Sequence, residues 1–250
     1  MTPDTKGRYR FEVEPFTEDF QGYISWSHLG NTLLRCAQMH AESNGFGFGP
    51  MSREQLSWVF SRLIIDMERR PRTGEVFEVT TWPSEIFRQF TVRLFEVRDA
   101  EGHVIGNAYS IWALIDVKTR QPADLQNLPT GSFEDFLIPA PDFPIAGPGR
   151  IRVKSEEPLL TRQARVSDLD INGHVNSIRS LEMVLDLFPL ETYQTKRVRR
   201  VEMAYAKEAF CGDTLHFFTQ EDEPGKHSIE VRRATGDVTL RAQVTFEAKA

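Results

Sequence analysis

The stretch that decides the fold reads Val166-Ser167-Asp168-Leu169-Asp170-Ile171-Asn172-Gly173-His174-Val175-Asn176. It gathers two carboxylates, two carboxamides and an imidazole into one short segment. Apolar residues then recur at helical spacing as far as Pro189, namely Ile178, Leu181, Val184, Leu185 and Phe188. We therefore expect a strand, then a polar elbow, then a helix over 177–188 with His174 in or just before its first turn.

The elbow residues have the chemistry of a catalytic site. In an extended segment, the alternating Asp170, Asn172 and His174 would point to one side, and Gly173 would permit a turn. The start of the following helix offers unpaired N–H groups and a positive dipole end, which would stabilise an oxyanion. The alternative is a helix cap beside a surface histidine. A cap needs only one such residue, so we favour the site.

Composition limits the class of protein. The chain has 250 residues and a net charge of -6, which fits one large domain or two ordinary ones and argues against a nucleic-acid binder that relies on a basic field. No apolar run is long enough to span a bilayer, and the N-terminus lacks the apolar core of a signal peptide. Cys36 and Cys211 form neither a disulfide framework nor a metal cluster, and no phosphate loop appears. We expect a cytoplasmic protein without a metal or cofactor.

The first half reads as one helix followed by strands. Ser25 is the expected N-cap of a helix over 26–43, and a Gly-rich loop over 44–50 follows it. Strands are expected over 58–69, 75–82, 88–97 and 104–117, with hairpin-turn residues at 99–102. A stretch rich in Pro and Gly then predicts a linker over 127–150.

The second half repeats this order. A strand from about Arg152 leads to the elbow and its helix, and strands follow over 197–207, 214–220, 228–233 and 238–248. Gly74-Glu75-Val76-Phe77 parallels Gly212-Asp213-Thr214-Leu215, so the repeat is a duplicated domain. Each half is an α+β unit in which a helix covers an antiparallel sheet. The expected boundaries are 1–126 for the N-terminal domain, 127–150 for the linker and 151–250 for the C-terminal domain.

Several strings resemble one family. In the second half they are the elbow and Tyr205-Ala206-Lys207-Glu208; in the first half they are Trp58-Val59-Phe60-Ser61-Arg62, Arg69-Arg70-Pro71-Arg72-Thr73-Gly74-Glu75 and Thr81-Trp82. At these spacings the chain resembles the acyl-acyl carrier protein thioesterases, which are tandem hotdogs. That resemblance implies two antiparallel sheets, each wrapped on one long central helix.

The resemblance also implies a function. It predicts hydrolysis of a fatty acyl-acyl carrier protein thioester by Asp170, Asn172, His174 and Glu208 in the C-terminal domain, with the acyl chain held in the N-terminal domain against the helix over 26–43. No cofactor is implied, the partner is acyl carrier protein, and the chain is a monomer or a homodimer. Plant members carry a Cys where this chain has Ala209. The nearest thiol is Cys211, which we expect to be a small buried hydrophobe.

Alternatives remain open at this point. Glu208 and His174 would assist attack by water, or Glu208 would attack directly and form an anhydride. Rival functions are an acyl-CoA thioesterase, a hydratase of the same superfamily, and a non-catalytic acyl-thioester-binding protein. The hydratases normally show Pro where Gly173 stands. A further hypothesis assigns carrier-protein docking to basic residues, namely Arg150, Arg152, Lys154, Arg197, Arg199 and Arg200.

Overall fold

The computed structural model describes residues 6–128 and 131–249, and Pro129 of the expected linker lies outside the described residues. The chain divides into two compact units. The first comprises Met1–Arg62 and Met67–Gly147, and the second comprises Leu63–Asp66 and Pro148–Ala250. No helix of the described residues is long and apolar enough to cross a membrane.

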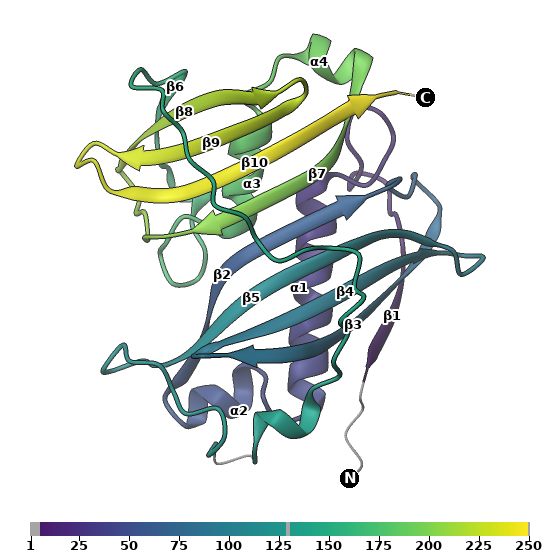
Figure 1. The fold of residues 1–250 in the computed structure, drawn as a ribbon, viewed down its shortest axis with the longest axis vertical. Helices are drawn as coiled ribbons and strands as arrows, with labels where there is room; N and C mark the ends of the chain where they lie inside the picture. The colour runs from purple at the N-terminus through teal and green to yellow at the C-terminus, as the bar shows by residue number, and fades with distance from the viewer. Residues whose placement is uncertain (1–5, 129–130, 250) are drawn as a thin grey trace. The chain divides into compact units, whose positions relative to one another are not determined.

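The first unit is a sheet covered by one long helix. Its elements are β1 (Gly7–Glu12), α1 (Trp26–Ser43), α2 (Phe48–Arg53), β2 (Leu56–Met67), β3 (Val76–Phe87), β4 (Phe90–Asp99), β5 (Val104–Asp116) and the 3₁₀ helix η1 (Phe133–Phe136). Within β2, residues Leu63–Asp66 count with the second unit. The strands lie in the order β1-β3-β4-β5-β2, and the pairings β1–β3, β3–β4 and β4–β5 are antiparallel. Helix α1 lies across one face of this sheet (Figure 1).

Helix α1 forms where the sequence predicts it. Ser25 accepts a hydrogen bond from the N–H of His28, which satisfies one of the free donors at the helix start. The buried side of the helix has residues at spacings of three and four, namely Leu29, Leu33, Cys36, Ala37 and His40. The predicted helix over 26–43 is therefore confirmed.

The expected linker is partly packed onto the first unit. The Trp82 Nε1–H donates to the carbonyl of Ile138, and the ring of Phe143 lies edge-on to Trp82. Phe133 and Phe136 pack against Phe46. In Figure 1 this segment crosses the sheet on the face opposite α1. With both faces covered, consecutive residues of β3 are buried rather than alternating.

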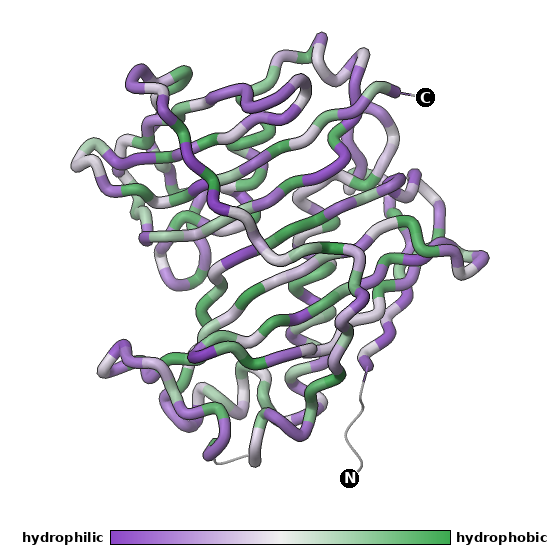
Figure 2. The backbone as a smooth tube through the Cα atoms, in the orientation of Figure 1, coloured by the Kyte–Doolittle hydropathy of each residue, from purple (hydrophilic) through white to green (hydrophobic). Residues whose placement is uncertain are grey.

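The second unit repeats the plan with a shorter helix. Its elements are β6 (Leu160–Gln163), the 3₁₀ helix η2 (Val166–Asp168), α3 (Ser177–Leu185), α4 (Leu190–Thr195), β7 (Lys196–Tyr205), β8 (Thr214–Glu223), β9 (Lys226–Arg233) and β10 (Val238–Ala248). The strands lie in the order β7-β10-β9-β8-β6 and pair antiparallel. Hydrophobic and hydrophilic residues are interspersed along the strands of both units (Figure 2).

Four local predictions were wrong. Helix α2 begins inside the predicted Gly-rich loop. Gly49 and Pro50 occupy its first turn, where proline costs no hydrogen bond and a Glu42 carboxylate oxygen accepts from the N–H of Gly49. The strand expected from Arg152 is only the four residues of β6. The elbow helix ends at Leu185 rather than Phe188, so it has nine residues against eighteen in α1. Helix α4 was not predicted.

Candidate active site

The elbow is a tight turn, not the extended segment that the alternation suggested. The N–H of Gly173 donates to the Asp170 carbonyl, and the N–H of Asp170 donates to the His174 carbonyl. Gly173 has φ of 78°, a left-handed conformation that glycine adopts without strain. The predicted turn at Gly173 is therefore confirmed, whereas the extended backbone assumed for the alternation of Asp170, Asn172 and His174 is not found.

Asp170 orders this turn. Its Oδ1 accepts the N–H of Asn172 at 2.8 Å and the N–H of His174 at 3.1 Å. Such side-chain-to-backbone bonds are typical of Asp at turns. The carboxylate thus fixes the backbone that carries Asn172, whose side chain is exposed, and His174.

Glu208 reaches the same place from the end of β7. The chain leaves β7 at Tyr205, and the N–H of Ala206 donates to the Thr239 carbonyl of β10. It then returns to the elbow, where the N–H of Val175 donates to the Ala209 carbonyl at 2.8 Å. These bonds bring Glu208 Oε2 within 3.6 Å of His174 Nε2. The two side chains are 44% and 28% exposed, so both are open to water.

The aromatic ring beside His174 comes from the same return segment. Phe210 lies edge-on to the imidazole with ring centroids 5.2 Å apart. Cys211 follows it and is exposed, so the expectation of a buried cysteine was wrong at this position, whereas Cys36 is buried. Burial raises the pKa of the Cys36 thiol to about 12, which keeps it protonated and inert.

Two of the N–H groups that the sequence suggested for an oxyanion hole, at the start of α3, already have a partner. Asn176 is the N-cap, and its Oδ1 accepts the N–H groups of both Ile178 and Arg179. Those two donors are therefore occupied by the cap. Asn172, which the sequence analysis singled out, offers an exposed carboxamide as a hydrogen-bond donor at the elbow.

Sequence reasoning assigned no role to Asp168, although the structure gives it several partners. Its side chain is 0% exposed, and its Oδ2 accepts from Arg162 Nη2 at 2.6 Å and from the Arg165 N–H at 2.9 Å. Arg179 Nη2 lies 3.5 Å from Oδ1. The Asp168 carbonyl accepts the N–H of Asn176. Asp168 thus joins β6, the two ends of the elbow and α3.

Tyr205 was quoted only as part of a family string, yet it supports the same elbow. Its hydroxyl donates to the Ser177 carbonyl at 2.9 Å, which ties the end of β7 to the first turn of α3. Burial raises the pKa of Tyr205, so the phenol stays protonated and keeps donating. The structural role of Asp168 had one signal in the sequence, its place three residues after Arg165, which is the spacing of a carboxylate that accepts a backbone N–H at a helix start. No sequence signal pointed to the role of Tyr205.

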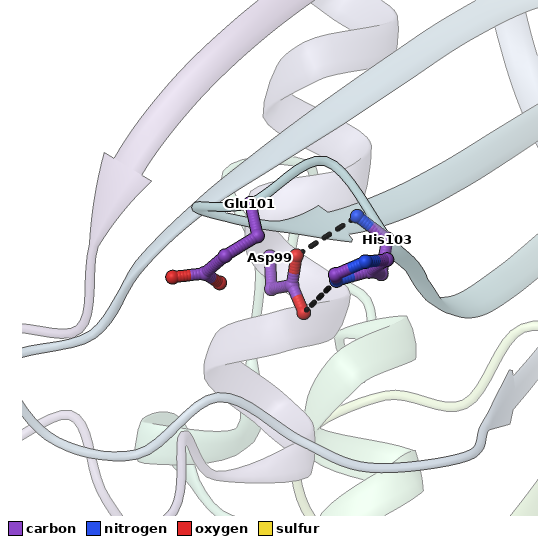
Figure 3. Close-up of side chains that lie close together, drawn as sticks. All are labelled: Asp99, Glu101 and His103. Carbon is purple, nitrogen blue, oxygen red and sulfur yellow. Dashed lines mark hydrogen bonds and ion pairs between the residues drawn. The ribbon is translucent and has the colours of Figure 1, made fainter.

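A second group of potential ligands lies at the β4–β5 hairpin. Asp99, Glu101 and His103 have ligand atoms within 4.8 Å of one another. Figure 3 shows the N–H and ring of His103 engaging Asp99 while the Glu101 carboxylate points away from both. Arg69 Nη2 also lies 3.3 Å from Asp99. Because Asp99 is committed to its turn and to Arg69, we assign no metal to this group.

Three of the six basic residues proposed for docking, Arg197, Arg199 and Arg200, face acids of their own unit. Arg197 pairs with Glu247, and Arg199 lies 2.7 Å from Asp66. Arg200 also lies 3.4 Å from Asp66. Each arginine of this run is thus partly neutralised, which weakens the docking hypothesis. It stays a prediction.

Family models cover both units. The acyl-ACP thioesterase N-terminal domain matches residues 4–127, and the acyl-ACP thioesterase C-terminal domain matches residues 153–248. The chain belongs to the acyl-ACP thioesterase family. The alignment places the elbow and Glu208 in the C-terminal domain of that family.

Solved structures and curated relatives agree with this membership. An acyl-ACP thioesterase from Bacteroides thetaiotaomicron superposes with a TM-score of 0.91 at 45% identity, covering 98% of both chains. A 12:0-ACP thioesterase from Umbellularia californica gives 0.82 at 22% identity, also over 98% of both chains, and shows the shared fold. The predicted α+β tandem hotdog is confirmed.

Among curated sequences, the chloroplastic oleoyl-acyl carrier protein thioesterase 2 of Arabidopsis thaliana is 28% identical over 229 residues. The match covers 84% of this chain and 62% of that relative. A palmitoyl-acyl carrier protein thioesterase of Cuphea hookeriana is 26% identical, covering 80% of this chain and 50% of the relative. The chain therefore spans about half to three-fifths of the length of these relatives.

Proposed function

We propose that this acyl-ACP thioesterase family member hydrolyses the thioester of fatty acyl-acyl carrier protein, releasing a free fatty acid and the carrier-protein thiol. The observation that carries the proposal is the contact of 3.6 Å between His174 Nε2 and Glu208 Oε2. A carboxylate and an imidazole in contact, both open to water, form the pair that thioester hydrolysis needs.

The proton movements follow from this contact. Glu208 takes a proton from water as the water oxygen bonds to the thioester carbonyl carbon. The proton passes from Glu208 to His174 Nε2, and His174 gives it to the sulfur as the carbon–sulfur bond breaks. The products are a carboxylic acid and a thiol, so atoms and charge balance without a cofactor or a metal.

The other two elbow residues support this pair. The exposed Asn172 carboxamide donates to the carbonyl oxygen as it becomes negative, a contribution of about 10²–10³-fold for one such donor. Asp170 holds the backbone N–H groups of both Asn172 and His174. Asp170 acts through the turn and does not itself move a proton.

We assign the acyl chain to the first unit, between α1 and the sheet. The helix face there is apolar at Leu29, Leu33 and Ala37, and β3 and β4 contribute buried apolar residues on one face of the sheet, namely Val79, Phe95 and Val97. An acyl chain is recognised by such a surface through burial of its methylenes. The boundaries 1–126, 127–150 and 151–250 remain our proposed division between chain-binding domain, linker and catalytic domain.

Release of free thiol from acyl-acyl carrier proteins of graded length tests the function. Wild type should release thiol, and Glu208→Gln should lower kcat by about 10²–10⁴-fold because the general base is lost. Glu191→Gln, an exposed acid at the start of α4, is the matched control and should leave the rate within twofold, roughly the scatter expected for a surface change. If wild type releases no thiol at any length, the proposal fails.

The same assay separates the rival functions. An acyl-CoA thioesterase would release thiol from coenzyme A thioesters faster than from carrier-protein thioesters. A hydratase would change the acyl chain without releasing thiol, and a non-catalytic binding protein would bind without reaction. Single turnover in H₂¹⁸O would label Glu208 only if it attacks directly and forms an anhydride. The cytoplasmic location and the monomeric or homodimeric state stay predictions.

A further inference from the structure

A buried polar group lies inside the first unit, whereas the elbow belongs to the second. Arg93 of β4 is 7% exposed, His40 in the last turn of α1 is 2% exposed, and Thr81 of β3 is fully buried. Such residue types are rarely buried without a reason, because each must find partners for its polar atoms. The proposed hydrolysis uses none of them.

These side chains form a bridge from the sheet to the helix. Arg93 Nη1 lies 3.1 Å from His40 Nδ1 and 3.4 Å from the Thr81 hydroxyl. Because His40 belongs to α1 and Arg93 to β4, the hydrogen bond spans the layer between helix and sheet. We call Arg93, His40 and Thr81 the bridge.

The bridge carries a positive charge. Burial lowers the pKa of Arg93 to about 10, which still leaves the guanidinium protonated at neutral pH, and the nearby Tyr9 opposes that shift. Among the residues that the structure describes, no carboxylate forms an ion pair with Arg93. Replacing buried charges by apolar groups is often neutral or stabilising. Stability alone therefore does not account for an arginine here.

The bridge marks the end of an apolar layer. Along the buried side of α1, Leu29, Leu33 and Ala37 precede His40. On the facing strands, Thr81 pairs with Phe95 and Val79 pairs with Val97, while Arg93 pairs with Pro83 and Ser110 at the next position of the same face. Apolar side chains thus line helix and sheet as far as the bridge, which joins the two across the layer.

We propose that the Arg93–His40 bridge is the stop that sets the upper length of the acyl chain this protein accepts. The inference rests on the proposed function, with the acyl chain lying between α1 and the sheet. A chain that ends before the bridge meets mostly apolar side chains, and the buried Thr32 hydroxyl already donates to the His28 carbonyl. A longer one would have to part the hydrogen bond and leave a guanidinium facing methylenes.

Variants of Arg93 test the stop directly. Arg93→Ala removes the bridge and opens the layer, and Arg93→Met removes the charge and hydrogen bond with an apolar chain of similar length that should fold well. Arg93→Lys retains a cation that can donate to His40. Arg98→Ala changes another arginine of β4, one that pairs with Glu96 and the Gly102 carbonyl, and is the matched control.

Two measurements are needed for each variant. One is kcat/KM over saturated acyl-acyl carrier proteins of graded length, and the other is the dissociation constant for free fatty acids of the same lengths. In Arg93→Ala and Arg93→Met, the preference for chains a few carbons beyond the wild-type optimum should rise about tenfold or more relative to the optimum. Arg93→Lys and Arg98→Ala should keep the wild-type profile.

The outcomes separate this inference from the proposed function. If wild type hydrolyses acyl-acyl carrier proteins and neither Arg93→Ala nor Arg93→Met shifts the length profile, the stop is refuted and the function stands. If wild type releases no thiol but the longest fatty acid bound increases in these variants, the stop stands and the function falls. A shift of equal size in Arg98→Ala would also refute the stop, since it would not depend on the bridge.

Discussion

Asp168→Ala should damage both stability and turnover, because this buried carboxylate holds the elbow closed. The change removes the oxygen that accepts from the Arg162 guanidinium and from the Arg165 N–H. It also leaves Arg179 with Glu182 but without its second carboxylate partner. Removing one partner of a buried ion pair typically costs about 3–5 kcal/mol. Arg162 and Arg179 are 30% and 45% exposed and can turn toward water, so we expect the lower end, about 3 kcal/mol.

That loss is measurable by thermal or denaturant unfolding. A loss of about 3 kcal/mol corresponds to a fall in Tm of roughly 6–12 °C for a chain of this size. The elbow also carries His174, and a displacement of about 1 Å at a reacting group can cost 10²-fold in rate. We therefore expect kcat to fall by roughly 10–100-fold with little change in KM, since Asp168 belongs to the second unit and the proposed acyl layer is built from residues of the first.

Two further variants make the reasoning refutable. Arg162→Met/Asp168→Ala removes the orphaned cation together with the carboxylate, so part of the lost stability should return. Asp168→Asn keeps an acceptor for the Arg165 N–H and should lose less than Asp168→Ala. If Asp168→Ala costs less than about 1 kcal/mol, the buried-pair argument is wrong. If stability falls but kcat is unchanged, Asp168 holds the fold without positioning His174.

Three other outcomes follow from named contacts. Cys211→Ser should retain the wild-type rate within about twofold, because an exposed thiol outside the His174–Glu208 contact takes no part in the proposed steps. A loss of rate comparable to that of Glu208→Gln would contradict this and assign Cys211 a catalytic role. His227 packs against the rings of Phe188 and Phe246, and burial lowers its pKa below the usual 6.5. The unfolded chain then binds a proton first, so stability should fall as the pH drops below about 6.5, and His227→Gln should flatten that slope in pH-dependent unfolding. Phe46→Ala should lower the free energy of unfolding by about 3–5 kcal/mol by opening a cavity beneath η1, and calorimetry that finds under 1 kcal/mol would show that the segment around Phe133 is not held by this ring.

Local pattern predicted the regular elements well and the irregular ones badly. The apolar spacing from Leu29 to His40 and the Ser25 cap defined α1 because both signals are local. The strand expected from Arg152 failed because residues near it gain their order from contacts with distant parts, such as the Lys154 N–H donating to Gln220. Helix α2 was hidden by glycines, whose effect depends on the turn they occupy.

The residues of the candidate site could be predicted from the sequence, but the hydrogen bonds that each of them makes could not. Asp170, Asn172 and His174 could be read from spacing and Glu208 from family resemblance, yet the premise of an extended elbow was wrong. Spacing along the chain does not show which partner each oxygen and each N–H group binds. Only the fold shows that Asn176 Oδ1 accepts the N–H groups of Ile178 and Arg179. Only the fold shows, too, that Asp168 is buried between β6, the elbow and α3.

The distribution of hydrogen bonds divides the elbow acids by role. A carboxylate whose oxygen accepts two backbone N–H groups, as Asp170 does, serves the geometry of the turn rather than proton transfer. A carboxylate sealed from solvent and paired with arginines, as Asp168 is, cannot meet water or substrate. Glu208 differs from both, because it is open to solvent and touches the imidazole. Of Asp168, Asp170 and Glu208, only Glu208 therefore has the position that the proposed general base requires. Substituting Asp168 or Asp170 should change the rate through the placement of His174.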